Sequence, residues 1–317
     1  MKSLMQCEIL CAVDLEHDSY AAEFVAYALA KKLSAKLTLL HVDSTLRQMR
    51  YYNSYSNQFF PNLELNRISA ESTAELIRQL RHRVHAIGAA GDSNVTVEVI
   101  EGEPAEEIFN YVKKSKFNVE YIVLSKRKRS FFDEFFLGSV AHQIVEMSTV
   151  PVLLIPDDKS AFVEWNPQQF FIASSLENEA SQSLQNCLPL VEAFRSKMIL
   201  VHIMPDKLLY QNSMSDNLVQ SQKDDLDLFF TSSELKVKKQ MMNHALKLNC
   251  LAENVECQVL FGSAIEKLAG LGTDLAGDVL VVGRNISTGF IPSFGAGIAG
   301  SLARTARCPL LIVPHQK

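Results

Sequence analysis

The stretch Leu37–Val42, LTLLHV, returns about 160 residues later as Met198–Ile203, MILVHI. Both are apolar runs that end in histidine and a β-branched residue. Three further pairs of segments repeat in the same order. They are CEILCAVDLE (Cys7–Glu16) with QFFIASSLEN (Gln169–Asn178), VEVIEGEPAEEI (Val97–Ile108) with CQVLFGSAIEKL (Cys257–Leu268), and PVLLIP (Pro151–Pro156) with PLLIVP (Pro309–Pro314). Four matched blocks in one order indicate two copies of one unit.

Each copy alternates short buried strands with segments of helical period, such as Tyr20–Lys32. Strands that alternate with helices indicate a parallel sheet. Their unbroken runs of Val, Ile and Leu are typical of a sheet covered by helices on both faces. The sequence therefore predicts an α/β protein with two tandem, doubly wound, Rossmann-like parallel-sheet domains, residues 1–157 and 168–317. Asp157–Pro167, DDKSAFVEWNP, breaks the periodic pattern and is predicted to be the linker.

Composition and charge narrow the functional classes. A net charge of −5 at pH 7 argues against binding to nucleic acid or anionic lipid. No apolar run reaches the ~20 residues of a membrane helix, and the start, MKSLMQCEILCAVD, does not read as a signal peptide. The six cysteines form no C-x-x-C pair, which argues against disulfides and zinc. We expect a soluble cytoplasmic protein, without membrane, nucleic-acid or metal partners, that binds small molecules or proteins.

In an open parallel sheet, ligands bind beyond the carboxyl ends of the strands, where the strand order reverses. Asp14 follows the first predicted strand, and His41 and Val42 end the second. The loop after the fourth strand leads to Gly138 and Ser139, directly before a helix. A helix amino end attracts phosphate, so this arrangement suits an anion or a nucleotide. The alternative is that Gly138 and Ser139 only begin the helix, and that Asp14 only caps the helix after strand one.

Two other features carry alternatives of their own. The basic run Lys126–Arg129 could attract an anion through its side chains, or it could be a solvated loop. His41 and His202 stand at equivalent strand ends, and no nucleophile or carboxylate lies beside them at a catalytic spacing. We therefore interpret both histidines as structural.

The segments of copy one resemble the universal stress protein (UspA-like) pattern. They are ILCAVDLEHDSYAAEFVAYALA, LTLLHV, VEVIEGEPAEEI, and EYIVLS with LGSVAHQIVEMSTVPVLLIP. Copy two resembles the pattern through FFIASSLENEASQSLQNCLPLVEAF, ILVHI, VLFGSAIEKLAGL, and DVLVVGRN with AGSLARTARCPLLIVP. The resemblance covers nearly the whole chain and implies the adenine nucleotide alpha hydrolase-like form of the sheet.

Members of this family that bind ATP carry an Asp after the first strand for adenine. They also carry the motif G-x-x-G, nine residues, G-S/T for ribose and phosphates. In copy one the resemblance places Asp14 at the first position and Gly138 with Ser139 at the terminal pair. The two earlier glycines are replaced by Ser125 and Lys128.

Copy two departs from the motif in a different way. Gly283 keeps the first glycine and Ile286 replaces the second. Ala296 and Gly297 stand at the terminal pair, and Ser175 replaces the Asp. A side chain in place of a glycine lies where a phosphate would lie, so the resemblance implies a degraded ATP-binding motif in both copies. The candidate cofactor-binding residues are Val13, Asp14, His41, Val42, Ser125, Lys128, Gly138, Ser139, Val140, Gly283 and Gly297.

No P-loop, G-x-G-x-x-G, G-x-S-x-G or metal-ligand cluster follows a predicted strand. We predict a universal stress protein that acts in the stress response as a non-catalytic binding and signalling module, with no catalytic residues. We expect its copies to pair through their last strands, PVLLIP and PLLIVP, because pairing removes exposed edges. Homodimer formation and the identity of protein partners stay open.

The alternative function is an adenine-nucleotide (ATP) binding protein, or a slow ATPase, that uses the crevice of copy one. An enzyme of the ATP pyrophosphatase kind is disfavoured, because its glycine- and serine-rich first loop is absent and LEHDSY follows strand one.

Overall fold

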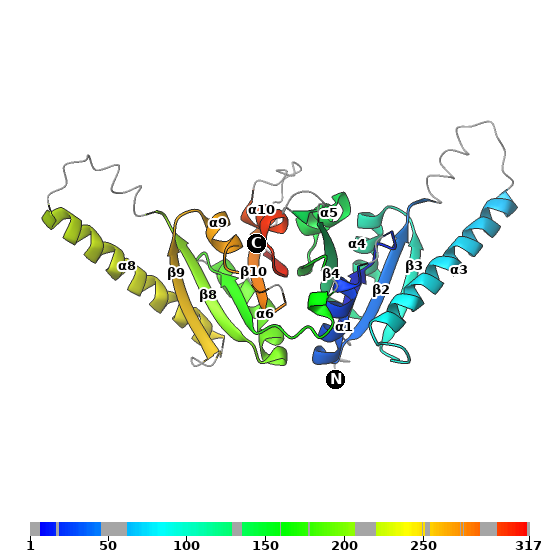
Figure 1. Ribbon diagram of the computed structural model, residues 1–317, viewed down its shortest axis with the longest axis horizontal. Coiled ribbons are helices and arrows are strands. Elements are labelled where there is room, and N and C mark those ends of the chain that lie inside the picture. Colours follow the sequence, from blue (N-terminus) through cyan, green and yellow to red (C-terminus); the bar gives the residue numbers. More distant parts are fainter. Residues whose placement is uncertain are drawn as a thin grey trace, which may run out of the picture. The chain divides into compact units, whose positions relative to one another are not determined.

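The chain divides into two compact units, Met1–Trp165 and Asn166–Lys317 (Figure 1). The computed structural model describes residues 7–16, 19–45, 62–128, 135–158, 160–176, 178–206, 220–248, 250, 254–272, 274, 276–285 and 297–315. In both units, strands alternate with helices along the chain.

Unit 1 is built on a parallel sheet with the strand order β3-β2-β1-β4-β6. The short strand β5 pairs antiparallel with β4. The elements are β1 (Cys7–Ala12), α1 (Ala21–Leu33), β2 (Lys36–Asp43), α3 (Asn62–Ala86), β3 (Val95–Glu101), α4 (Pro104–Lys114), β4 (Asn118–Lys128), β5 (Phe135–Phe136), α5 (Ser139–Met147), β6 (Val152–Pro156) and the 3-10 turn η1 (Ser160–Phe162). Because crossovers between parallel strands are right-handed, α1 and α3 cover one face, and α4 and α5 cover the other.

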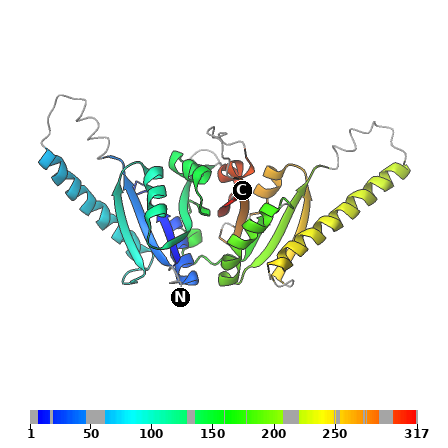
Figure 2. The same cartoon turned by 180° about the vertical axis from the view of Figure 1, so that it is seen from behind.

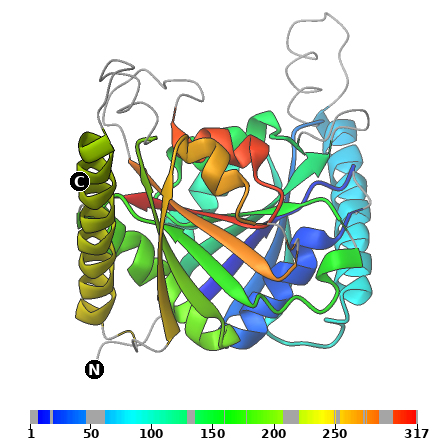
Figure 3. The ribbon, with the colours of Figure 1, turned by 60° about the vertical axis from the view of Figure 1, so that its left-hand side comes forward.

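Unit 2 repeats this plan with the strand order β9-β8-β7-β10-β11, again all parallel. Its elements are β7 (Gln169–Ala173), α6 (Asn178–Phe194), β8 (Lys197–Met204), α8 (Gln220–Lys247), β9 (Val255–Phe261), α9 (Ala264–Ala269), β10 (Asp278–Asn285), α10 (Ile298–Thr305) and β11 (Leu310–His315). The long helix α8 lies alongside β9 (Figure 3), as α3 lies alongside β3 in unit 1 (Figure 2). The predicted α/β class with two tandem, doubly wound parallel sheets is confirmed.

The local sequence explains why the first helix forms and where it ends. In α1 the buried side chains recur at helical spacing, as at Ala22, Val25, Ala26 and Leu29. Such a stripe packs one side of the helix against the sheet. The helix ends at Ser34, whose left-handed backbone (φ 52°) accommodates the closing turn.

The same backbone contacts occur at matching places in both units. The Val13 N–H bonds the Leu40 carbonyl at 2.8 Å, and the Ser174 N–H bonds the Val201 carbonyl at 2.8 Å. The two histidines at the strand ends also behave alike. Nδ1 of His41 lies 2.9 Å from the Val13 carbonyl oxygen, and Nδ1 of His202 lies 2.7 Å from the Ser174 carbonyl oxygen. Each imidazole therefore links the end of its own strand to the residue that follows the adjacent strand.

Lys126, the first residue of the basic run, is neither in a solvated loop nor exposed to an anion. Lys126 and Lys128 belong to β4, and the Lys126 side chain is fully buried rather than solvated. The strand continues this far because its last residues still pair with neighbouring strands. Lys126 pairs with Pro156 of β6, and Lys128 pairs with Phe135 of β5. Arg129 lies outside the described residues.

The segment predicted as the linker is packed against unit 1. Within it, η1 contacts α1, and the side chains of Phe162 and Trp165 are buried. The two aromatic residues explain this packing, because their large apolar surfaces favour burial. Pairing of the two units through β6 and β11 stays a prediction. Among the helices of the described residues, none combines the length and the apolar character that crossing a membrane requires.

A buried carboxylate holds together the amino-terminal edge of the sheet in unit 1. Glu8 is fully buried, and it accepts hydrogen bonds from Thr38 Oγ1 (2.6 Å), Ser115 Oγ (2.6 Å) and Tyr111 OH (2.9 Å). Its Oε1 also lies 3.3 Å from Lys36 Nζ. Burial alone would raise the pKa of Glu8, but the hydrogen bonds and Lys36 hold it below its ordinary value of 4.5.

This network predicts a pH-dependent loss of stability in Glu8→Gln. A lowered carboxyl pKa stabilises the fold above the unfolded-state pKa, and that stability is lost as the pH falls through the folded-state value. We expect Glu8→Gln to lower the free energy of unfolding by about 1–3 kcal/mol at pH 7, with a smaller difference at pH 3. Urea unfolding followed by the fluorescence of Trp165, the single tryptophan, measures it. Glu164→Gln, at an exposed position, is the control, and equal losses at both pH values would contradict the prediction.

Candidate functional site

A cavity of about 670 Å³ lies in unit 1 at the carboxyl ends of β1, β2 and β4. The strand order reverses between β1 and β4, so the cavity lies at the switch point of the sheet. Eight of the eleven candidate residues line it, and they come from four separate segments. These residues are Val13, Asp14, His41, Val42, Ser125, Gly138, Ser139 and Val140.

The three remaining candidates lie elsewhere. Lys128 is the last residue of β4, and its side chain lies outside the described part of the chain. Gly283 and Gly297 belong to unit 2, in β10 and at the start of α10. In the second copy, Ile286 and Ala296 also fall outside the described residues.

Asp14 begins the loop between β1 and α1. Its side chain is exposed, and its Oδ1 accepts a hydrogen bond from the Glu16 N–H at 3.1 Å. Helix α1 begins only at Ala21, and its N-cap residue is Tyr20. Asp14 therefore stabilises a turn of the loop and does not cap the helix, which removes one of the two sequence-based interpretations.

Gly138 and Ser139 line the cavity at the amino end of α5. Gly138 is the N-cap residue, and no side chain caps the helix. The space around Gly138 is open, since a Cβ placed there would meet no atom within 4 Å. The amino end of α5 therefore borders the cavity without a covering side chain, as a helix end that receives an anion requires.

A buried ion pair anchors the loop that carries Asp14. Arg83 of α3 lies 2.5 Å from Glu23 Oε1 of α1, and both side chains are almost completely buried. The same guanidinium donates to the carbonyl oxygens of Ser19 (2.9 Å) and Asp14 (3.2 Å). Arg83 therefore fixes both ends of the loop to the helix that follows β2.

The surroundings of this pair shift the pKa of Glu23 upward. Burial is the largest cause, and the nearby Asp157 carboxylate adds to it. The charge of Arg83 and its hydrogen bond act in the opposite direction. Glu23, Arg83 and Asp157 all line the cavity, so its inner wall is charged.

Glu23, Arg83 and Asp157 are not among the site residues predicted from the sequence. A signal for the first two was present, because each interrupts an apolar helical stripe. Glu23 stands between Ala22 and Val25 in α1, and Arg83 follows the buried Leu80 by three residues. A charged residue on a buried helix face needs a buried partner of opposite charge. An acidic residue on one such face and a basic residue on another can therefore be predicted to form a pair.

Unit 2 places different residues at the corresponding positions. The long helices α3 and α8 end in the same kind of hydrogen bond, from Ala89 N–H to the Val84 carbonyl and from Cys250 N–H to the Ala245 carbonyl. Aligning the two bonds makes Arg83, one residue before Val84, correspond to His244. In the same way, the bond from Ala35 to Ala30 matches the one from Ser196 to Val191. Glu23 therefore corresponds to the buried Leu184 of α6, and unit 2 has no equivalent of the Glu23–Arg83 pair at these positions.

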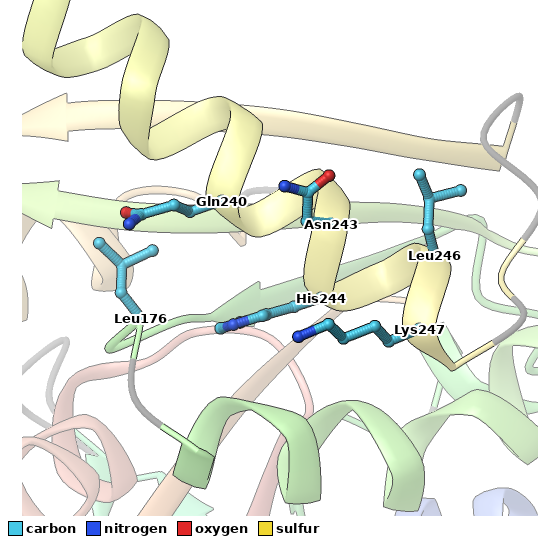
Figure 4. A pocket seen from close by; sticks show the side chains of 6 residues that line it. All are labelled: Leu176, Gln240, Asn243, His244, Leu246 and Lys247. Carbon is cyan, nitrogen blue, oxygen red and sulfur yellow. The ribbon is translucent and has the colours of Figure 1, made fainter.

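The change leaves a cavity of about 540 Å³ beside α8 (Figure 4). Figure 4 shows Leu176, from the loop after β7, facing Gln240 and His244 of α8. Within the described structure, Nδ1 of His244 is buried without a hydrogen-bond partner. Arg83 bridges helix and loop in unit 1, whereas the shorter imidazole does not bridge them here.

In the described part of unit 2, the ring of His315 occupies a place that corresponds to part of the cavity of unit 1. The strand register matches Ser125 with Gly283, and Asp157 with His315. The His315 ring lies directly against Gly283, where an added Cβ would collide with it. Its Nε2 lies 2.9 Å from Ser183 Oγ, at the position that corresponds to Ala22. Gly283 therefore makes room for a ring of its own chain.

This contact predicts that Gly283→Ala destabilises unit 2. The new methyl group must displace the His315 ring, and overpacking of this kind costs about 1–3 kcal/mol. Gly297→Ala is the matched control, because a Cβ at Gly297 meets open space and its φ is −92°. Hydrogen exchange of β10 and β11, followed by mass spectrometry, measures the change. Equal exchange rates in both variants would contradict the prediction, and His315→Ala should relieve the effect of Gly283→Ala.

The ion pair of unit 1 gives a second prediction. Glu23→Leu leaves the buried guanidinium of Arg83 without its carboxylate, and we expect a loss of about 3–5 kcal/mol in the free energy of unfolding. The double variant Glu23→Leu/Arg83→His carries the residue types of unit 2 and should lose less than Glu23→Leu alone. Urea unfolding followed by Trp165 fluorescence measures both variants. A double variant less stable than the single one would show that the two residues act independently.

Comparison with known proteins agrees with this architecture. The model of the universal stress protein family matches residues 7–156. Universal stress protein YxiE of Bacillus subtilis (strain 168) is 32% identical over 157 residues, which span 47% of this chain and 97% of that protein.

Two solved structures share the fold over nearly the whole chain. A universal stress protein from Archaeoglobus fulgidus has a TM-score of 0.65 at 14% identity, with 98% of both chains covered. A putative universal stress protein from Pseudomonas aeruginosa has a TM-score of 0.57 at 12% identity, covering 98% of this chain and 93% of that one. Because this chain is 32% identical to YxiE along almost the full length of that protein, it belongs to the universal stress protein family.

Proposed function

We propose that this chain is a non-catalytic binding and signalling module of the stress response. In this proposal unit 1 binds one adenine nucleoside or nucleotide, and unit 2 is a structural counterpart that binds none. The observation that carries the proposal is the cavity of unit 1, which brings Asp14, Val42, Gly138 and Ser139 together from three segments. Its volume of about 670 Å³ falls within the ~300–1,000 Å³ typical of small-molecule sites.

The lining of the cavity suits a flat heterocycle joined to a polar group. Apolar side chains from several segments line it, among them Val13, Val42 and Ile108. An adenine ring needs such apolar contacts on its faces and a few polar groups at its edge. Asp14 also lines the cavity and can accept a hydrogen bond from the exocyclic amino group of adenine. The amino end of α5 borders the same cavity and suits a ribose hydroxyl or a phosphate.

The differences in unit 2 support a stoichiometry of one ligand per chain. Ser175 stands in place of Asp14. The ring of His315 lies against Gly283 and next to Ser183, where unit 1 has its cavity. A ligand in the equivalent place would have to displace a buried side chain, which unit 1 does not require.

Isothermal titration calorimetry with adenosine and AMP tests this proposal. We expect one site per chain, and a Kd raised at least about tenfold by Asp14→Asn, because the amide oxygen is a weaker acceptor than a carboxylate. Ser175→Ala is the matched control in unit 2 and should bind as the unaltered chain does. Two sites per chain, or equal affinities of Asp14→Asn and the unaltered protein, would contradict the assignment.

A further inference from the structure

The charge of the cavity restricts the ligand further. Among the described residues that line it, five carry carboxylates and one carries a guanidinium. The acidic residues are Asp14, Glu16, Glu23, Asp43 and Asp157, and the basic one is Arg83. Carboxyl groups therefore outnumber the basic group in this lining. A ligand with several negative charges would be repelled from such a cavity, and the repulsion grows with each added phosphate.

The single cation of this lining is already engaged by protein groups. Arg83 forms the ion pair with Glu23 and donates to the carbonyl oxygens of Ser19 and Asp14. Turning it toward a phosphate would break these bonds and leave a buried carboxylate without its partner, which is strongly unfavourable. Arg83 therefore positions the loop and does not serve as a phosphate ligand.

The backbone after Ser125 is engaged as well. Lys126 and Lys128 continue β4 and pair with β6 and β5. The carbonyl of Lys126 accepts the N–H of Asp157 at 3.1 Å, which brings a carboxylate residue to this edge of the cavity. A phosphate chain is bound by a loop whose N–H groups point inward, and residues that continue a strand and pair with its neighbours do not form such a loop.

We infer that the cavity of unit 1 selects adenine ligands with at most one phosphate, namely the nucleoside or the nucleoside monophosphate, and discriminates against ADP and ATP. This inference rests on the proposed function of unit 1. The amino end of α5, at Gly138 and Ser139, is the one place in the described lining that suits a phosphate, and it accommodates a single group. The acidic lining supplies the discrimination against longer phosphate chains.

Titration calorimetry with adenosine, AMP, ADP and ATP, in EDTA and again with Mg²⁺, tests the inference on the full-length chain. We expect adenosine and AMP to bind at least about tenfold more tightly than ATP in EDTA. The ratio of the Kd of ATP to the Kd of AMP should fall as the salt concentration is raised from about 20 mM to 300 mM, because salt screens the repulsion. A ratio that does not change with salt would assign the discrimination to shape instead of charge and would overturn the inference.

Asp157→Asn gives a variant-based test, because it removes one charge from the lining. We expect it to raise the affinity for ATP severalfold and to leave the affinity for uncharged adenosine within about twofold. Asp158→Asn is the matched control, since Asp158 is the exposed neighbour and does not line the cavity. Equal effects of Asp157→Asn on ATP and adenosine would count against the inference.

The outcomes separate this inference from the proposed function. ATP, alone or with Mg²⁺, binding more tightly than AMP would overturn the inference and leave unit 1 as an adenine-nucleotide site. If none of the four compounds binds, both the proposed function and the inference are wrong.

Discussion

The position of β1 between two parallel partners governs the rest of unit 1. β1 pairs with β2 on one side and with β4 on the other, so the chain must first run outward to β3 and then return across the sheet. Right-handed crossovers place the outgoing helices on one face and the returning helices on the other. The loops after β1 and β4 consequently diverge, and the space between them is the cavity.

The two units have the same strand order, but they carry different side chains at matching positions around the cavity of unit 1. Unit 1 keeps an open cavity whose β1–α1 loop is anchored by the buried Arg83–Glu23 pair. Unit 2 has His244 and Leu184 at those positions, and the ring of His315 beside Gly283. The same strand register and the same histidine contact at the end of the second strand persist in both. The two units therefore share their backbone pairing, and they differ in a few side chains around the cavity of unit 1.

The sequence was sufficient to predict the fold, because the buried strands and helices carry strong periodic patterns that repeat in matched order. It also placed most of the candidate residues near one another, since strand ends in a parallel sheet meet at one edge. The charged inner wall was not predicted. Glu23 and Arg83 are 60 residues apart, and although each interrupts an apolar stripe, the sequence does not show that the two helix faces meet. The length of β4 was also misjudged, because pairing with β5 and β6 outweighs the solvation expected of lysines.

Gly283 shows the difference between matching a sequence motif and having an open site. At this position the sequence of unit 2 matches the nucleotide-binding motif more closely than that of unit 1, which has Ser125 there. The open cavity nevertheless lies beside Ser125, while the space beside Gly283 holds an imidazole from the last strand of the same domain. An absent side chain makes room without specifying what fills it, so the number of motif glycines in a domain does not by itself show where a cavity lies.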